Sequence, residues 1–401
     1  MKKILWWKTK VGEEEIDHVV QSMRNKCFSQ GKVTEEFERN LSEYLEVEHV
    51  IAVCNGSSAI LIALMAAGIL PGDEVIVPNK TWIATAHAVQ ILGAKTIIVD
   101  TEEDRPIIDA NLIEAKITLK TKAIIPVHMN GRASNMKKIN EIAKKYNLFV
   151  FEDAAQAIGS RNTDGLLGTQ SDIGCFSLSV AKVIATGQGG FAVTNNLDLA
   201  TKLRAIRTHG VENVKDPYEW PMPGHNFRFN DLAASIGIEQ LKRLPERIKH
   251  LKAIYEVYDN DLKDSAFKII PVNIDSGEIP IYNEFLVENR KIWIKKLEDF
   301  SVETRAFYPN INAASYLGQT KERFINSEIF AKNGITLPSG PNQEISSVKK
   351  RIKRILKVCK SDEFINKKKE GIDFYINEKS TNISGGQKQR IGIARALYKN
   401  P

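Results

Sequence analysis

The stretch NMKKINEIAKKYNLFVFEDAAQAIG, residues 135–159, carries the pattern that decides the fold. It begins as a helical stretch and continues into a short β-rich run, NLFVFED, at 147–153. Glu152 and Asp153 end that run, and ligands bind at the carboxyl ends of strands in an open α/β sheet. The stretch therefore predicts a helix–strand unit with two carboxylates at a ligand-binding edge.

The same alternation extends up to about residue 200. Helical stretches separate many of the further β-rich runs, which lie at 49–54, 73–78, 95–100, 122–128, 173–179 and 190–194. Strands that alternate with helices indicate crossover units and a mostly parallel, buried sheet. The fold class predicted for this part is therefore α/β.

Two long helices are expected to follow, at 228–244 and 246–262. They lead to a smaller part with strands expected within 279–287 and 302–309, which is the pattern of an α+β domain.

The length and composition fit a globular protein with two domains. The chain has 401 residues, of which 43% are hydrophobic and 26% are charged. We place a large domain at 1–245, a small C-terminal domain at 246–360 and an appended tail at 361–401.

The net charge of +7 does not by itself identify a partner. KKRIKRILKVCK, residues 349–360, carries seven lysines and arginines, and its apolar residues fall at helical spacing. We interpret it as an amphipathic helix with a solvated basic face, and expect no nucleic-acid partner. An anionic substrate would still benefit from the basic field.

Cysteine usage and hydropathy indicate a cytoplasmic protein. The four cysteines lie far apart without metal-ligand spacing, so no metal site is expected and a reducing compartment fits best. No apolar stretch of about 18 residues occurs, so we expect no membrane span.

The C-terminal tail resembles a segment of a different class of protein. STNISGGQKQRIGIARALYKNP, residues 380–401, is similar to the signature segment of ABC transporter ATPases. Such an ATPase also needs a phosphate loop of the form G-x-x-x-x-G-K-[ST], and the glycine-rich TGQGGF at 186–191 has no following Lys-Ser or Lys-Thr. We therefore interpret 361–401 as an appended, truncated segment without a function of its own.

Three segments of the alternating region carry candidate chemistry. Asp153 ends a strand, although an aspartate there also suits a helix cap. Lys182, in CFSLSVAKVIATGQGG at 175–190, follows a strand among small and apolar residues, where an amine can become nucleophilic; a surface lysine is the alternative. CNGSSAILIALMAAGI, residues 54–69, turns from a strand into a helix at a Gly-Ser-Ser sequence, which suits a phosphate.

Together these are the parts of a pyridoxal phosphate site. The lysine amine holds the cofactor, the helix start anchors its phosphate, and the carboxylate keeps the pyridine nitrogen protonated.

The chain from about residue 8 to residue 360 resembles the DegT-type nucleotide-sugar aminotransferases, a perosamine-synthase-like branch of the fold type I pyridoxal phosphate enzymes. The resemblance rests on motifs that occur in the family's order and spacing: GDEVIVPNKTWIATAHAV, FEDAAQAIGS, FSLSVAKVIATGQGG, GHNFRFNDLAASIG and RAFYPN. It implies an aspartate-aminotransferase-like large domain with a mixed, mostly parallel sheet.

The resemblance also implies roles for residues around the cofactor ring. Lys182 occupies the position of the lysine that carries pyridoxal 5′-phosphate, and Asp153 the position beside the pyridine nitrogen. Gln156 matches the residue near the phenolic oxygen, and Trp82 the aromatic residue that stacks on the ring.

Further matches concern the phosphate. Gly56 lies at the helix start, and Ser57, Ser58 and Ser177 match phosphate ligands. Asn226 matches a residue that reaches the phosphate bound by the neighbouring subunit, so a homodimer with shared sites is implied.

The implied reaction moves an amino group from an amino acid, by resemblance glutamate, to a nucleotide-linked keto sugar, such as a 4-keto-6-deoxy hexose, in amino-sugar or polysaccharide biosynthesis. Tyr308 and Arg305 are candidate contacts of the sugar nucleotide, and His209 and His225 are candidates for substrate contact or structural histidines.

Three alternatives remain open. A sugar dehydratase on the same scaffold carries histidine at the position of Lys182, a regulator would bind the cofactor without catalysis, and an ABC transporter ATPase would need the missing phosphate loop.

Overall fold

The computed structural model describes residues 3–213, 219–318, 322–350 and 352. The tail at 361–401 and most of the basic helix expected at 349–360 lie outside these residues, so both remain predictions.

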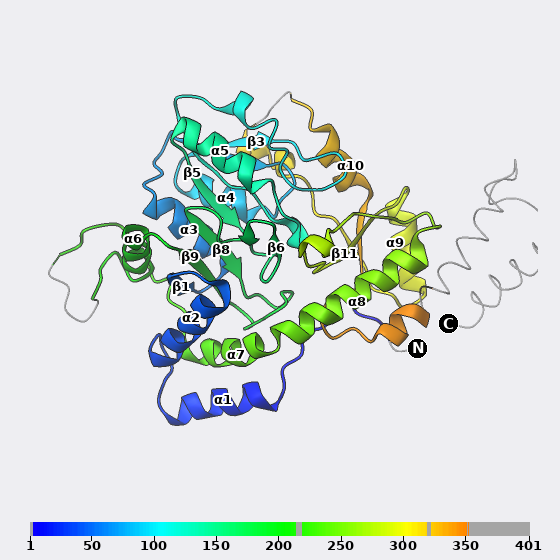
Figure 1. Ribbon diagram of the computed structural model, residues 1–401, viewed down its shortest axis with the longest axis horizontal. Coiled ribbons are helices and arrows are strands. Elements are labelled where there is room, and N and C mark those ends of the chain that lie inside the picture. The colour runs from blue at the N-terminus through cyan, green and yellow to red at the C-terminus, as the bar shows by residue number, and fades with distance from the viewer. Residues whose placement is uncertain (1–2, 214–218, 319–321, 351, 353–401) are drawn as a thin grey trace, which may run out of the picture.

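A seven-stranded sheet forms the centre of the larger part, in the order β1-β9-β8-β5-β4-β2-β3 (Figure 1). Its strands are β1 His49–Val53, β2 Glu74–Pro78, β3 Lys95–Val99, β4 Thr121–Ile124, β5 Phe149–Asp153, β8 Ile173–Ser177 and β9 Gly190–Thr194. β9 pairs antiparallel with β1 and β8, whereas the other neighbouring pairs are parallel. The predicted mixed, mostly parallel sheet is confirmed, and each expected strand forms.

Helices cover both faces of this sheet. They are α2 Lys32–Leu45, α3 Gly56–Ala66, α4 Ala84–Ile91, α5 Met136–Tyr146, α6 Leu197–Arg207 and α7 Asp231–Lys242, and α1 Glu13–Arg24 packs against α7 on the side away from the sheet (Figure 1). α5 buries Met136, Ile139 and Ile142 and exposes its lysines, as its helical spacing requires.

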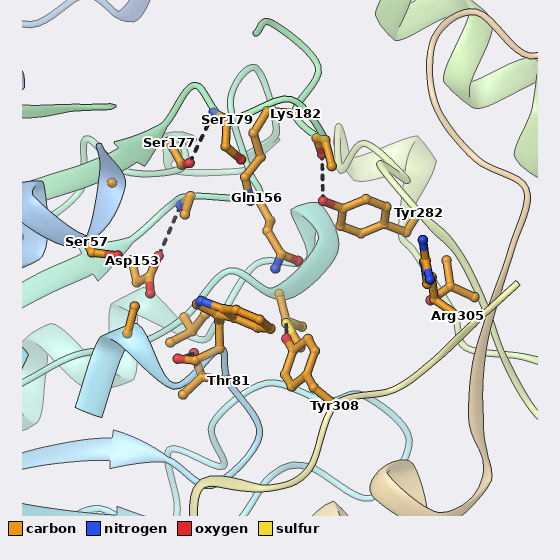
Figure 2. Close-up of a pocket in the computed structure, with 18 of the residues that line it drawn as sticks. Ser57, Thr81, Asp153, Gln156, Ser177, Ser179, Lys182, Tyr282, Arg305 and Tyr308 are labelled. Atoms are coloured by element: carbon orange, nitrogen blue, oxygen red, sulfur yellow. Dashed lines mark hydrogen bonds between the residues drawn. The ribbon is translucent and has the colours of Figure 1, made fainter. Parts of the chain in front are cut away.

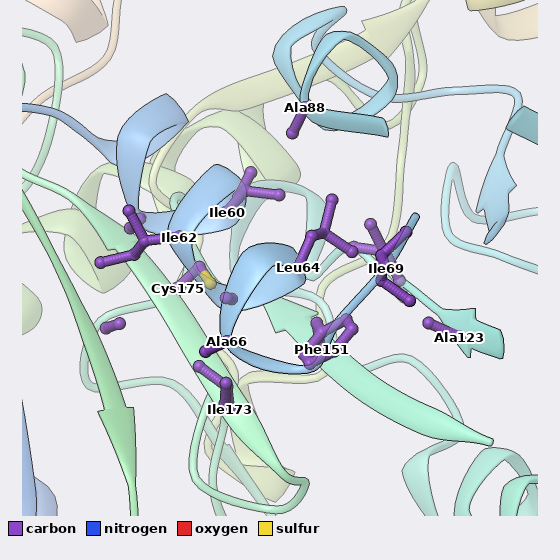
Figure 3. Close-up of a cluster of buried hydrophobic side chains, with 14 of the residues drawn as sticks. Ile60, Ile62, Leu64, Ala66, Ile69, Ala88, Ala123, Phe151, Ile173 and Cys175 are labelled. Atoms are coloured by element: carbon purple, nitrogen blue, oxygen red, sulfur yellow. The ribbon is translucent and has the colours of Figure 1, made fainter. Parts of the chain in front are cut away.

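α3 is buried almost all round. Its side chains pack into one apolar cluster with residues of β5 and β8, such as Phe151 and Ile173 (Figure 3). Such burial explains why the sequence of α3 is apolar on every face, and it fixes the start of the helix against the sheet.

Asparagine begins four of these helices. The side chains of Asn55, Asn135, Asn196 and Asn230 each accept a hydrogen bond from a backbone amide three residues later. Such a cap satisfies an amide that the helix itself leaves unpaired.

The smaller part contains an antiparallel sheet in the order β10-β11-β13-β12. Its strands are β10 Lys268–Ile269, β11 Asn283–Leu286, β12 Arg305–Ala306 and β13 Gly334–Leu337, with the helices α9 Arg290–Asp299 and α10 Ile325–Asn333 beside them. The predicted α+β character is confirmed. A short hairpin of β6 Arg161–Asn162 and β7 Gly165–Leu166 lies in the larger part.

The helix α8, Leu244–Leu262, joins the two parts (Figure 1). Its Leu251 packs in the core of the larger part, whereas Tyr258 and Leu262 pack in the core beside the small sheet. The domain boundary expected after residue 245 falls at the start of this helix and remains a prediction.

The N-terminal segment also crosses between the parts. Ile4 pairs with Val302, and the backbone amide of Ser339 donates a hydrogen bond to the carbonyl of Trp6 over 2.7 Å. The indole of the next residue, Trp7, donates to the carbonyl of Val180 over 2.9 Å. The segment thus connects the small sheet with the loop that carries Lys182.

Within the part of the chain that is described, no helix has both the length and the apolar character needed to cross a membrane.

Candidate active site

A cavity of about 800 Å³ lies between the carboxyl edge of the large sheet and the small sheet. Figure 2 shows Ser57 and Asp153 on one side of it and Tyr282 and Arg305 on the other. The predicted site residues that line it are Gly56, Ser57, Trp82, Asp153, Gln156, Ser177, Lys182, Arg305 and Tyr308. The volume is typical of a site for a small-molecule ligand.

The start of α3 forms one end of the cavity. Asn55 caps the helix by accepting from the amide of Ser58 over 2.8 Å. A Cβ atom at Gly56 would lie 2.8 Å from the Cβ of Ser177, so only glycine allows this close approach of helix and strand. Gly56, Ser57 and Ser177 therefore line a helix N-terminus that suits an anion.

Ser58 has a different environment. It is buried and does not line the cavity, and its hydroxyl lies 3.3 Å from the sulfur of Cys54. Its predicted role as a phosphate ligand remains untested, and the geometry favours Ser57 and Ser177.

Asp153 is a buried carboxylate at the end of β5. It accepts hydrogen bonds from the hydroxyl of Thr85 over 2.8 Å and from the amide of Ala155 over 3.2 Å. Burial raises the pKa of the Asp153 carboxyl, and these two hydrogen bonds oppose the shift. Because it has no ion pair among the described residues, a protonated ring nitrogen in the cavity would supply the missing positive charge.

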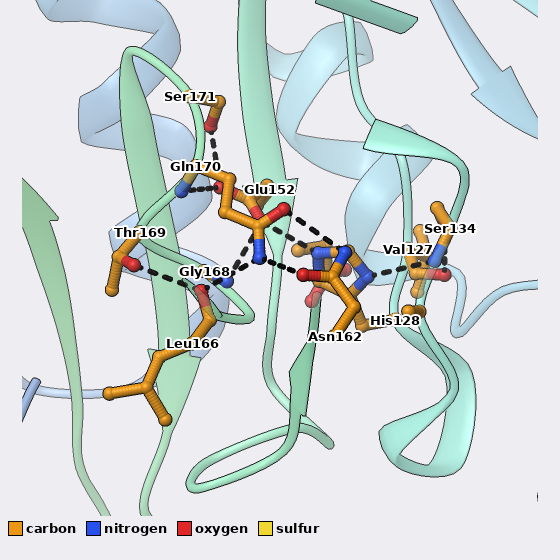
Figure 4. Close-up of polar contacts among 12 residues, drawn as sticks. Val127, His128, Ser134, Glu152, Asn162, Leu166, Gly168, Thr169, Gln170 and Ser171 are labelled. Carbon is orange, nitrogen blue, oxygen red and sulfur yellow. Dashed lines mark hydrogen bonds and ion pairs between the residues drawn. The ribbon is translucent and has the colours of Figure 1, made fainter. Parts of the chain in front are cut away.

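Glu152 points away from the cavity, because neighbouring residues of a strand face opposite sides. Its carboxylate accepts from the ring of His128 and the amide of Gly168, both over 2.8 Å, and from the amide of Gln170 and the hydroxyl of Ser171 (Figure 4). Glu152 is thus fully hydrogen-bonded and holds the end of β5 in place rather than acting beside Asp153.

Lys182 is half-buried on the loop between β8 and β9. Burial lowers its pKa to about 8, and the nearby Asp153 opposes that shift. An amine with such a pKa is far more often unprotonated at neutral pH than an exposed lysine, so the structure favours the nucleophilic interpretation.

Three carbonyl groups next to Lys182 are held by distant side chains. Trp7 donates to Val180, Tyr282 to Ala181 over 2.7 Å, and Arg247 to Val183 over 2.6 Å. Each donor comes from a different segment, so the loop is fixed before any ligand binds.

Trp82 and Tyr308 form the opposite wall. Their rings lie 5.4 Å apart at 86°, and 58% of the Trp82 surface is exposed. Gln156 accepts from the amide of Asn130 over 3.0 Å. A planar ring would find an aromatic surface here, as the role predicted for Trp82 requires.

Besides Ser58, three predicted residues lie outside the cavity. Asn226 is exposed and accepts from Arg228, while His209 and His225 pair with each other through their backbones. The roles predicted for these three residues remain predictions.

Sequence reasoning missed several polar residues of the site. Thr85 lies inside a recognised motif but offers no signal of its contact with Asp153. Glu284 is the one charged residue of the strand stretch IPIYNEFLV, and the alternation of strand residues puts it on the same face as Tyr282.

The sequence model of the DegT/DnrJ/EryC1/StrS aminotransferase family matches residues 9–356. The chain belongs to this family. The predicted resemblance is thereby confirmed, and the chain is an aminotransferase whose cofactor is pyridoxal 5′-phosphate.

Similarity to individual proteins supports the assignment to the DegT family. GDP-perosamine synthase from Caulobacter vibrioides is 34% identical over 334 residues, which cover 81% of this chain and 90% of that protein. The structure of DesV from S. venezuelae, in complex with a ketimine intermediate, has a TM-score of 0.82 at 28% identity and covers 88% of this chain and 99% of that one. The sugar aminotransferase Spr1654 from Streptococcus pneumoniae, in its PLP form, has a TM-score of 0.81 at 25% identity, with 88% and 98% covered.

The cavity offers a suitable group for each part of pyridoxal 5′-phosphate, the cofactor of the DegT family. The start of α3 offers backbone amides and hydroxyls for a phosphate, Asp153 is a buried carboxylate with no ion pair among the described residues, and Lys182 is an amine with a lowered pKa. These groups meet in one cavity although they lie more than 120 residues apart in the sequence, from Gly56 to Lys182.

Proposed function

We propose that this aminotransferase moves the amino group of an amino acid, glutamate in the first instance, to a nucleotide-linked 4-keto-6-deoxy hexose. The observation that carries the proposal is the meeting of Lys182, Asp153 and the start of α3 in one cavity that polar side chains of the small sheet also line. A GDP-linked sugar is the first substrate to test, because a relative that is 34% identical is a GDP-perosamine synthase.

Each residue has a task toward the cofactor. Gly56, Ser57 and Ser177 would hold the phosphate, and Trp82 would cover the ring. When bound, pyridoxal phosphate supplies an electron sink for charge that develops at the substrate carbon. Asp153 would keep the ring nitrogen protonated, which that sink requires.

Lys182 has two tasks. Its Nζ would hold the cofactor between turnovers, and once released as an amine it would move the proton that leaves the substrate carbon. A lowered pKa suits both tasks, because only the unprotonated amine has a free electron pair.

The direct experiment supplies the protein with glutamate and a set of nucleotide-linked keto sugars and looks for the amino sugar by mass spectrometry. A product whose mass shows nitrogen in place of the keto oxygen supports the proposal. Nitrogen transfer to 2-oxo acids but to no keto sugar would contradict it.

The same experiment addresses the dehydratase and regulator alternatives. A dehydratase would release water from the sugar without nitrogen transfer, and a regulator would leave the sugar unchanged. A lysine rather than a histidine at position 182 supports transamination over dehydration.

We further propose a cytoplasmic homodimer in which Asn226 of one subunit reaches the phosphate bound by the other. The exposed position of Asn226, outside the cavity of its own chain, supports this arrangement. Light scattering gives the oligomeric state. If the arrangement holds, an Asn226→Ala variant should stay dimeric but bind the cofactor less tightly.

The rate at which Lys182 captures the cofactor should depend on pH. Below its pKa of about 8 the lysine is an ammonium group without a free electron pair, so the capture rate should rise about tenfold per pH unit up to about pH 8 and then level off. Mixing cofactor-free protein with pyridoxal phosphate and following absorbance measures this rate. A rate that keeps rising beyond pH 10 would indicate an ordinary, exposed lysine.

Deleting the tail, residues 361–401, should leave cofactor binding, oligomeric state and turnover unchanged. The reason is that the sequence contains no phosphate loop to accompany the ATPase-like signature, so the short helix expected in the tail would have no such domain of this chain to pack on. Thermal unfolding and turnover of the truncated chain test this. A melting temperature several degrees lower, or ATP binding that disappears with the tail, would show that the tail has a role.

A further inference from the structure

Three polar residues form a row across the small sheet. Strand pairing places Glu284 of β11 opposite Thr336 of β13, and Thr336 opposite Arg305 of β12. Residues directly opposite each other point to the same face of a sheet, and all three line the cavity. The wall that faces Lys182 thus carries a carboxylate, a hydroxyl and a guanidinium side by side.

We propose that Glu284 recognises a hydroxyl group of the sugar ring and so determines which substrate accepts the amino group. This inference rests on the proposed function and adds to it a residue that selects the sugar by binding one of its hydroxyl groups.

The carboxylate of Glu284 is held through one oxygen only. Its Oε2 accepts from Arg132 over 2.6 Å and from Asn130 over 3.0 Å, and both of these partners are fully buried. Arg132 also donates to the carbonyls of Ile270 and Pro271, which keeps it in place. The side chain of Glu284 is therefore fixed before substrate arrives.

The other oxygen is available. Glu284 Oε1 receives no hydrogen bond from the described residues, and it is not enclosed as the unpartnered buried side-chain atoms of this protein are. Because Glu284 lines the cavity and its Oε2 is occupied by Arg132 and Asn130, we infer that Oε1 is the oxygen that faces the cavity. A fixed carboxylate oxygen at the wall of a cavity is an acceptor for a hydroxyl donor.

The chemistry of Glu284 excludes the anionic ends of the two substrates. The phosphates of a nucleotide sugar and the carboxylates of glutamate carry only acceptor oxygens at neutral pH, so they cannot donate a hydrogen bond to Glu284, whereas sugar hydroxyls can. The amino group of glutamate can also donate, but it is the group that must react at the cofactor beside Lys182, so we assign Glu284 to the sugar ring.

Arg305 indicates how the sugar nucleotide would be oriented along this row of residues. Its side chain is 56% exposed, bridges to Glu303 over 2.9 Å and lies 5.3 Å from the ring of Trp6. Two steps across the strands separate it from Glu284 by about 10 Å, which is about the length of a hexose with its first phosphate. The sugar would lie over Glu284 and the diphosphate near Arg305, at the more exposed end.

The test separates the two halves of the reaction. Glu284→Gln should load nitrogen from glutamate at a rate within about twofold of wild type, whereas kcat/KM for a GDP-linked 4-keto-6-deoxy hexose should fall about ten- to a hundredfold, mainly through KM. Stopped-flow absorbance follows the first half, and product analysis follows the second.

The matched control is Glu278→Gln. Glu278 is a buried carboxylate that pairs with Arg105 and accepts from the amides of Ala133 and Asn273, but it does not line the cavity. Its replacement should lower stability without changing either half-reaction. Glu284→Asp keeps the charge beside Arg132 and withdraws the carboxylate, so it tests the same contact if the glutamine variant folds poorly.

A substrate analogue adds a readout that a structural role would not change. The wild-type protein should disfavour at least one deoxy analogue of the keto sugar that lacks a ring hydroxyl, and Glu284→Gln should lose most of that discrimination while Glu278→Gln keeps it. Equal slowing of both half-reactions, or unchanged discrimination, would overturn the inference. If wild-type protein loads nitrogen from glutamate but no keto sugar accepts it, the proposed function itself fails, and this is seen before any variant is made.

Discussion

Replacing Lys182 with alanine is expected to reduce turnover by on the order of 10⁴-fold or more. The variant loses both the amine that holds the cofactor and the base that moves the proton, and no other lysine lines the cavity in the described part of the chain. Turnover with glutamate and an accepted keto sugar measures the loss. The exposed Lys202 on α6 provides a control substitution that should leave turnover unchanged.

Chemical labelling identifies the lysine independently of activity. Sodium borohydride should fix the cofactor to the wild-type protein, and peptide mass spectrometry should find it on Lys182. Lys80 is the decisive comparison, because burial lowers its pKa to about 7 and it lies near the site, where its amine donates to the carbonyl of Tyr308. A label on Lys80 instead would show that the reactive lysine has been misassigned.

Asp153→Asn is expected to lower turnover by about a hundredfold or more, roughly 3 kcal/mol of transition-state stabilisation, while the cofactor stays bound. The amide has nearly the same shape, so the contacts with Thr85 and Ala155 largely persist, but it cannot keep the ring nitrogen protonated. Absorbance of the purified variant and its turnover provide the two measurements.

Asp172→Asn is the control for this change. Asp172 precedes β8 and accepts from the amide of Val150 over 2.8 Å, at the end of the sheet opposite the cavity. Its replacement should affect stability and not turnover. Near-normal turnover of Asp153→Asn would instead mean that this residue only caps the turn after β5.

The sheet was predictable because its strands are short, apolar runs separated by helices. β5 is an example. A strand was predicted within 147–153 with a carboxylate at its end, and the structure has a strand at Phe149–Asp153 that ends on that carboxylate. Lys182 and the start of α3 were predictable for a similar reason: each follows a strand directly, so the parallel arrangement brings them to one edge.

The row of polar residues across the small sheet could not be predicted in the same way. Glu284, Thr336 and Arg305 come from three strands, and their row depends on strand register, which the sequence does not specify. The opposite directions of Glu152 and Asp153 follow from strand alternation. The donors that fix the Lys182 loop, such as Arg247, come from segments with no motif at all.

The N-terminal segment has a consequence for how the protein matures on the ribosome. Ile4 and Trp6 are synthesised about 300 residues before their partners Val302 and Ser339. At about 5–20 residues per second, these partners emerge only after tens of seconds. Until then Trp6 and Trp7 lack part of their packing, so this apolar segment is available to chaperones, and the position of Trp7 beside the loop of Lys182 is completed late in folding.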